Sequence, residues 1–153
     1  MSAALTLKTV RKSYGRVQAL DGLDLEIPAG VICGLVGPNG AGKTTTFGVV
    51  GGLIQFDGGS VDILGEGPFD PRRHVGRVTL LPQDCQLNPH TPVRELLRFY
   101  GRLQGLGSAE AAREADRVLE LVALEDRAAA RIRQLSHGMR RRVAVAQALL
   151  GDP

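Results

Sequence analysis

The sequence has no tryptophan, two cysteines and only six tyrosine and phenylalanine residues among 153. Cys33 and Cys85 form neither a C-x-x-C pair nor a secreted disulfide framework, which favours a cytosolic protein. No apolar run approaches the roughly 18 residues that a membrane helix needs, and no leader-like segment with basic and then apolar residues opens the chain. We therefore expect any membrane contact to be made through a partner.

Lysine is also scarce, since Lys8, Lys12 and Lys43 stand against sixteen arginines. The net charge of +3 and the pI near 9.2 predict a solvated basic surface, and we expect no nucleic-acid partner. A content of 43% hydrophobic and 23% charged residues is ordinary for one soluble globular domain with an additional lobe.

Residues 37–44 read Gly-Pro-Asn-Gly-Ala-Gly-Lys-Thr and match the pattern G-x-x-x-x-G-K-[ST] at every fixed position. Glycines let the backbone turn successive N–H groups inward, and the helix that follows directs its positive end to the same point. The alternative is an ordinary glycine-rich turn, but a chance match at this composition is expected below about 1% of the time. The segment predicts a P-loop.

The P-loop pattern assigns a role to each of its polar residues. Lys43 places its charge against the outer phosphates, Thr44 offers its hydroxyl to Mg²⁺, and Thr45 donates to an inner phosphate. Each charge-assisted bond is worth about 1.5 to 3 kcal/mol. The nucleotide-binding residues expected here are Gly37, Pro38, Asn39, Gly40, Ala41, Gly42, Lys43, Thr44 and Thr45.

Periodicity predicts an α/β fold with a P-loop core, a mixed sheet that includes a small antiparallel β subdomain, and a helical lobe. Alternating residues predict half-exposed antiparallel strands at 4–10, 23–27 and 60–65, and continuous apolar runs predict buried parallel strands at 31–36 and 75–81. The first buried run would place Cys33 in the interior. A helix is expected from Lys43 to Val50, and Gln83 follows the second run, at the strand end where such sheets collect ligand groups.

Helical periodicity begins at Thr91 and Pro92 and continues in a second helix that Ser108 is expected to cap. Residues 121–126, four apolar residues and then two acids, mimic the strand that supplies the Mg²⁺ carboxylate in P-loop enzymes. Their apolar positions continue at helical spacing, so we interpret them as a helix end. The chain is thus divided into a nucleotide-binding core at 1–87, a helical subdomain at 88–135 and a final segment at 136–153.

The final segment contains Leu-Ser-His-Gly-Met at 135–139, followed by three arginines and a small-residue helix to Leu150. Ser136 is expected to cap this helix, and Gly138 to leave first-turn N–H groups uncovered, which predicts a second anion site. By default His137 is a surface histidine and residues 140–142 are a solvated flank. Tyr14 is either an ordinary half-buried tyrosine or an exposed ring that stacks on a base.

With the P-loop, Gln83 and the Leu-Ser-His-Gly-Met segment together, the chain resembles the ATP-binding cassette (ABC) ATPases over its whole length, and looks like the nucleotide-binding subunit of a transporter. The resemblance implies ATP and Mg²⁺ as ligands, with Tyr14 on adenine, Lys43 and Gln83 as catalytic groups, and Thr44 and Gln83 near the metal. It also implies that Ser136 and Gly138 close on ATP held by a second subunit in a head-to-tail dimer. The remaining partner is a transmembrane permease, which would hold the cytoplasmic subunit at the inner face of the cell membrane.

The Leu-Ser-His-Gly-Met segment at 135–139 resembles the family's signature motif, and two of its positions depart from the family pattern. Met139 replaces a frequent Gln, as in the branch of drug, polysaccharide or lipid exporters, so the resemblance favours export. His137 replaces the first of two glycines, and its ring would either hinder dimer closure or, when protonated, add a contact. The family's Asp-Glu strand and later His do not follow within 153 residues, so we expect the C-terminal part of the fold to be missing, and this chain by itself to bind ATP weakly and to hydrolyse none.

Two other functions stay open at this point. One is a soluble ABC-type ATPase of translation or DNA repair, although such proteins usually carry two cassettes or basic arms. The other is a non-hydrolysing truncated remnant. The leading interpretation is an exporter subunit whose full-length form hydrolyses MgATP to drive transport through its membrane partner.

Overall fold

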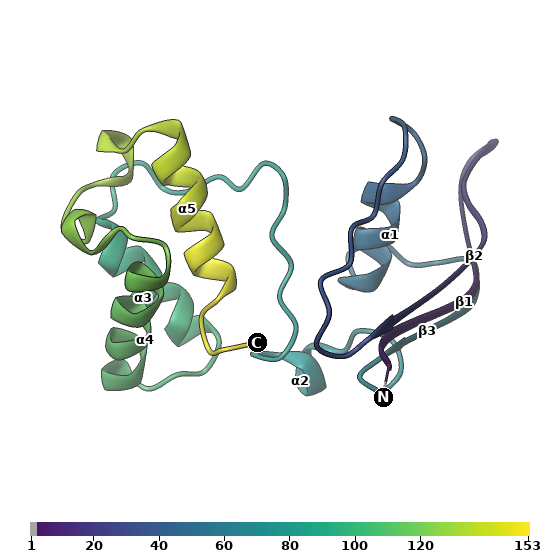
Figure 1. Cartoon of the computed structure of the whole chain (residues 1–153), viewed down its shortest axis with the longest axis horizontal. Helices are drawn as coiled ribbons and strands as arrows, with labels where there is room; N and C mark the ends of the chain where they lie inside the picture. The colour runs from purple at the N-terminus through teal and green to yellow at the C-terminus, as the bar shows by residue number, and fades with distance from the viewer. Residues whose placement is uncertain (1–2) are drawn as a thin grey trace. The chain divides into compact units, whose positions relative to one another are not determined.

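The computed structural model describes residues 3–153, which belong to two compact units, one ending at His74 and the other starting at Val75. The first unit contains strands β1 to β3 with helices α1 and α2, and the second contains α3 to α5 with two short 3-10 turns (Figure 1). The functional division at residues 87 and 135 stays a prediction. None of the helices within residues 3–153 has the length and apolar character required to cross a bilayer.

The first unit is built on a three-stranded antiparallel sheet in the order β2-β1-β3. Its strands are β1 (Ala3–Tyr14), β2 (Val17–Pro28) and β3 (Gly58–Ile63). The predicted antiparallel strands are therefore confirmed, and β1 and β2 are longer than expected. Leu7 and Val10 are three residues apart, so a regular strand would direct their side chains to opposite faces of the sheet. A register shift between them, with Thr9 at φ 50°, allows both side chains to be buried.

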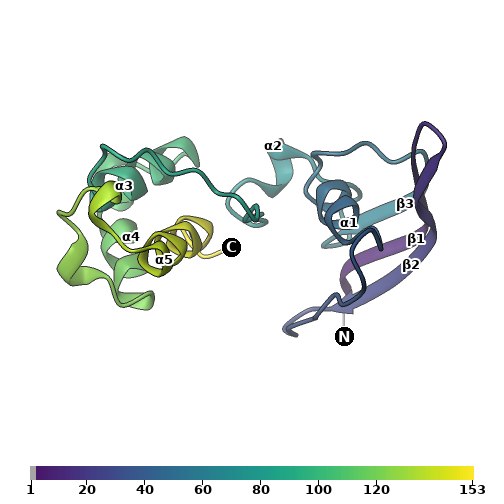
Figure 2. The ribbon, with the colours of Figure 1, turned by 90° about the horizontal axis from the view of Figure 1, so that it is seen from above.

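Helix α1 (Lys43–Val50) lies beside this sheet, as Figures 1 and 2 both show, and its bounds are those predicted. Thr46 and Val49 are buried on its inner side. Gly51 ends the helix, as expected. Gly58 and Gly59 begin β3, two residues before the predicted start of this strand.

The parallel part of the predicted sheet is not formed, and this corrects two strand predictions. Ile32 and Val36 are 104% and 93% exposed, and Cys33 is exposed, although the run 31–36 was expected to be buried. The run 75–81 is likewise irregular. A parallel strand is stabilised by ladder partners and by helices over both faces, and residues 3–153 supply neither segment with a partner strand.

The second unit is helical and has a well-packed core. Its elements are α3 (Val93–Leu103), α4 (Ser108–Leu121), η1 (Glu125–Arg127), η2 (Ile132–Gln134) and α5 (His137–Ala148). The core consists of Val93, Leu96, Leu97, Ala115, Val118, Leu119, Leu124, Ile132, Leu135, Val143, Ala146 and Leu150. The helices predicted from periodicity are confirmed, and so is the helix end at 121–126. Ser108 is the first helical residue with no cap bond of its own, so the predicted cap at Ser108 is wrong.

Arginines of this unit bond backbone carbonyls at helix ends. Arg142 Nη1 donates to the carbonyls of Val122 and Ala123, both at 2.9 Å, just after α4. Arg140 Nη1 donates to the Leu135 carbonyl at 2.7 Å, before α5. The arginine run is therefore more than the solvated flank expected, because two of its members satisfy carbonyls that helices leave without partners.

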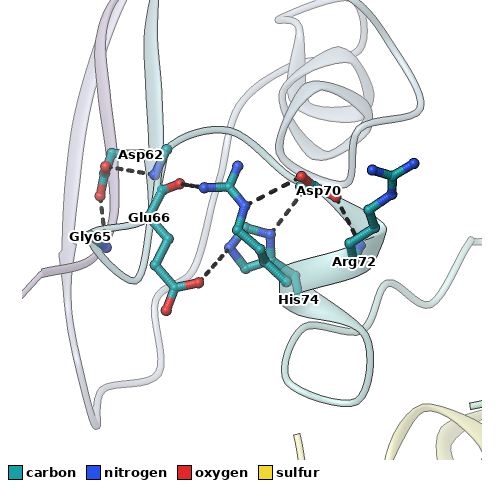
Figure 3. Close-up of polar contacts among 8 residues, drawn as sticks. Asp62, Gly65, Glu66, Asp70, Arg72 and His74 are labelled. Atoms are coloured by element: carbon teal, nitrogen blue, oxygen red, sulfur yellow. Dashed lines mark hydrogen bonds and ion pairs between the residues drawn. The ribbon is translucent and has the colours of Figure 1, made fainter. Parts of the chain in front are cut away.

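The first unit ends in a polar turn that leads into α2 (Pro71–His74), drawn in Figure 3. Asp62 at the end of β3 accepts from the N–H groups of Gly65 and Gly67. His74 is fully buried, and its Nδ1 accepts from the Asp70 N–H at 2.9 Å, while its Nε2 faces Glu66. These bonds hold the turn in shape.

Candidate functional site

The glycine-rich loop at 37–42 approaches β2 closely at Gly42. Gly42 adopts φ 82°, and a Cβ at this position would lie 2.5 Å from the Ala19 carbonyl oxygen and 2.8 Å from Leu20 Cδ2. Gly40 also has a left-handed φ, of 84°, but faces open space. The loop therefore bends as the pattern predicts, and Gly42 sets how closely it approaches the sheet.

The N-terminus of α1 is well suited to bind an anion. Gly42 occupies the cap position, no side chain caps the helix, and its first turn contains no acidic residue. The N–H of Thr46 and its hydroxyl both donate to the Gly42 carbonyl, at 2.8 and 3.0 Å. The N–H groups before it have no intrahelical acceptor, so they are the donors that a phosphate would use.

Lys43 extends back over the loop from the first turn of α1. Its Nζ donates to the carbonyls of Gly37 and Pro38, at 2.6 and 2.7 Å. The Ala41 N–H donates to the same Pro38 carbonyl at 3.2 Å, which closes the turn. An ammonium has three donors, so one remains for a ligand at the loop, and this positively charged donor set fits a triphosphate.

The hydroxyl residues of the loop are placed differently. Thr44 is exposed and Thr45 is half-buried. Within the described chain, no group of three or more His, Cys, Asp or Glu residues could hold a metal ion. The role of Thr44 toward Mg²⁺ stays a prediction.

Tyr14 lies at the tip of the β1–β2 hairpin with 48% of its surface exposed, in the same unit as the P-loop. Sequence reasoning missed its neighbours. Lys12 Nζ lies over the ring, 5.5 Å from its centroid, and pairs with Asp57 Oδ1 at 2.9 Å. No local spacing relates Asp57 to residues 44 or 45 positions earlier, so only the folded sheet reveals the cluster. The hydrogen bond from Lys12 holds the pKa of the Asp57 carboxyl below its ordinary value.

Gln83 lies in the irregular segment that leads to α3, and it is exposed. This segment is attached to α5 on both sides of Gln83. The Thr79 hydroxyl donates to the Ala148 carbonyl at 2.8 Å, and Cys85 Sγ lies 3.8 Å from Gln147 Oε1. Partial burial raises the pKa of the Cys85 thiol. Gln83 is thus displayed on a loop held at both ends, not at the end of a strand as predicted.

The serine cap at the start of α5 is confirmed. Ser136 Oγ accepts from the Met139 N–H at 3.2 Å, and His137 is an exposed residue of the first turn. A Cβ added at Gly138 would meet no atom within 4 Å, and the φ of this glycine is not left-handed. A glycine inside a helix costs up to about 1 kcal/mol relative to alanine, and local packing does not require this one.

The structure thus brings Tyr14 and the P-loop into one unit, and Gln83, Ser136 and Gly138 into the other. Within the first unit the loop can bind phosphate, and Tyr14 offers an exposed ring. In the second unit, Ser136 caps the start of α5, and no side chain among residues 3–153 covers Gly138 in the first turn. Whether all of these residues meet one nucleotide remains a prediction.

Comparisons with known proteins agree on one family. The family model described as ABC transporter matches residues 20–153. A Nod factor export ATP-binding protein I of Cupriavidus metallidurans is 46% identical over 155 aligned residues, which cover 100% of this chain and 51% of that protein. A daunorubicin resistance ATP-binding protein of Streptomyces coeruleorubidus is 39% identical, with 98% and 48% covered. A linearmycin resistance ATP-binding protein of Bacillus subtilis is 34% identical, with 97% and 48% covered.

Solved structures show the same fold. The crystal structure of an ATP-binding cassette of an ABC transporter in its ADP conformation matches with a TM-score of 0.86 and 24% identity, over 100% of this chain and 66% of that one. A nucleotide-free ATP-binding cassette from an ABC transporter matches with a TM-score of 0.83. The P-loop fold with an antiparallel β subdomain and helices is thereby confirmed. The chain spans about half the length of the curated relatives that it matches.

Proposed function

The chain belongs to the ABC transporter family, and from this membership we propose that it is the part of an exporter's ATP-binding subunit that holds MgATP. The observation that carries the proposal is the P-loop, where Lys43 and the uncapped start of α1 supply donors to one small volume. Thr44 is the residue offered to Mg²⁺, and Thr45 the one offered to an inner phosphate. The bound metal would neutralise phosphate charge.

Binding of MgATP to the full chain, measured by isothermal titration calorimetry, tests this proposal. Lys43→Ala removes the only lysine of the loop, so we expect affinity to fall about 10- to 150-fold. Lys8→Ala is the matched control, because Lys8 is an exposed lysine of β1 outside the loop, and it should leave affinity unchanged. Equal affinity in the wild type and Lys43→Ala would contradict the proposal.

We further propose a head-to-tail pair in which Ser136 and Gly138 contact the nucleotide held by the other subunit. The open surroundings of Gly138 and the exposed start of α5 support it. Gly138→Asp adds a negative charge at a helix N-terminus, which favours the folded monomer but repels a phosphate. We expect this variant to bind MgATP normally as a monomer and to lose ATP-dependent dimerisation in analytical ultracentrifugation. Dimers of undiminished stability would exclude the assigned contact.

Gln83 is proposed to couple the nucleotide to a membrane permease, since it is exposed on a loop attached at both ends. The names of the relatives, which include Nod factor export and resistance to two drugs, support export as the direction. We assign hydrolysis of ATP to the full-length protein, acting at the inner face of the cell membrane. Co-expression with a candidate permease should move the chain into the membrane fraction, and a chain that stays in the supernatant would contradict the assignment.

A further inference from the structure

We propose that Asp57 and Lys12 are positioning residues for the nucleotide base, acting through Tyr14. This inference rests on the proposed function, because it takes Tyr14 as the ring on which the base of ATP stacks. Neither residue belongs to the P-loop or to the signature segment. Their role follows from how they hold the tip of the β1–β2 hairpin.

Asp57 ties three consecutive hairpin residues to the start of β3. Its Oδ1 accepts from Lys12 Nζ at 2.9 Å, and its Oδ2 accepts from the Ser13 N–H at 2.7 Å. Its own N–H donates to the Arg11 carbonyl at 2.8 Å. One carboxylate and one amide therefore hold residues 11–13, immediately before Tyr14.

Lys12 carries this restraint to the aromatic ring. Its side chain is only 16% exposed, and its ammonium lies 2.9 Å from Asp57 Oδ1 and 5.5 Å from the centroid of the Tyr14 ring. A cation over an aromatic ring is attracted to it, so Lys12 restricts the ring while 48% of Tyr14 stays exposed. A ring that is already ordered loses less conformational entropy when a base stacks on it.

The position of Asp57 depends on a close approach of β3 to β1. A Cβ on Gly59 would clash with the Thr9 carbonyl oxygen, and Gly58 pairs with Arg11 across the ladder. Glycine at 59 lets the strands come together here, and Asp57 is thereby held against the hairpin. This explains why a residue 44 positions after Ser13 can reach its N–H group.

The inference predicts an effect that depends on the base. ATP carries both a base and a triphosphate, whereas inorganic tripolyphosphate carries only the charge that the P-loop binds. Loss of the Asp57 anchor should therefore weaken ATP and leave tripolyphosphate unaffected. A general disturbance of the unit would weaken both ligands together.

Calorimetry on the full chain with MgATP and with magnesium tripolyphosphate tests the inference. Tyr14→Ala should weaken ATP by about 5- to 150-fold, since base stacking on aromatic side chains has that worth. Asp57→Asn and Lys12→Met should each weaken ATP by about 3- to 10-fold, with tripolyphosphate unchanged. Lys12→Arg keeps the charge and should retain most of the ATP affinity.

Asp62→Asn is the matched control. Asp62 also accepts from two backbone N–H groups, those of Gly65 at 2.8 Å and Gly67 at 3.0 Å (Figure 3). It belongs to the same unit and pairs with Thr6 of β1, at a distance in sequence from Tyr14 at the hairpin tip. It should leave both ligands unaffected. The inference would be overturned if Asp57→Asn lowered the affinity for both ligands equally, or for neither. If it lowered neither affinity while Tyr14→Ala still weakened ATP binding, the proposed function would stand without the inference. A wild-type chain that binds neither ligand would overturn both.

Discussion

The two units of the chain differ in how completely they bury their apolar side chains and pair their backbone groups. The helices from Val75 onward enclose a core of large aliphatic residues, and arginines bond the carbonyls at the helix ends. The first unit pairs three antiparallel strands but leaves Ile32 and Val36 exposed. Helices satisfy their hydrogen bonds locally, whereas parallel strands require distant partners, so a helical lobe forms from its own residues where the parallel sheet does not.

The largest expected effect concerns the helical core. Leu124 is fully buried in the second unit, and Leu124→Ala should lower the free energy of unfolding of that unit by about 2 to 5 kcal/mol. Leu121, three residues earlier, is 60% exposed, so Leu121→Ala should change it by less than about 0.5 kcal/mol. Hydrogen exchange resolved by residue would measure both. Equal effects of the two substitutions would mean that the core is not packed as described.

The next effect is in the P-loop and separates two glycines. Gly42→Ala combines a left-handed φ with a clash against the Ala19 carbonyl, so it should cost more than about 2 kcal/mol of stability in the first unit. Gly40→Ala shares the φ but meets nothing within 4 Å, and should cost about 1 to 2 kcal/mol. Chemical denaturation would compare them. A Gly40→Ala variant as unstable as Gly42→Ala would show that packing against β2 contributes nothing.

A smaller effect sits where α4 meets the end of α5. Glu114 accepts from Arg117 at 2.8 and 2.9 Å and from the Gly151 N–H at 3.0 Å, and the bond from Arg117 lowers the pKa of Glu114. A carboxyl group with a lowered pKa stabilises the folded state at pH values above its ordinary pKa of 4.5. This contribution is lost as the pH falls below that value. Glu114→Gln should therefore cost about 0.5 to 1 kcal/mol at pH 7 and progressively less below pH 4.5.

Urea denaturation at several pH values would measure this difference. Glu110→Gln is a matched control, because Glu110 is exposed in the first turn of the same helix and forms no ion pair among the pairs described for residues 3–153. Its effect should be small at every pH. A Glu114→Gln effect that grows on acidification would have the wrong sign for this account.

The smallest expected effect is in the unpaired apolar segment. Ile32→Ser and Val36→Ser should change the stability of the first unit by less than about 0.5 kcal/mol, because both side chains are exposed. In the buried strand predicted from sequence, the same changes would cost several kcal/mol. Val61, 3% exposed in β3, provides the contrast, since Val61→Ser should be clearly destabilising. A large loss of stability in Ile32→Ser would instead support the buried strand predicted from the sequence.

Much of the candidate site could be predicted from local sequence. Residues 37–44 specify a bend and a helix start through their own glycines, and Ser136 specifies a cap three residues before the N–H that it accepts from. Lys12 and Asp57 could not be found this way, because their contact depends on the pairing of β1 with β3. The prediction of a strand at 31–36 was wrong for the same reason, because apolar composition alone does not supply a neighbouring strand to pair with.

The sequence by itself determined the P-loop, the capped start of α5 and the helical lobe, because each depends on residues within a few positions of one another. Tertiary structure alone decided which apolar runs become strands, how closely Gly42 approaches β2, and which charges surround Tyr14. The physical reason is that bends, caps and helices have short-range hydrogen bonds. Sheet registers and side-chain clusters are stabilised only when residues distant in the chain meet.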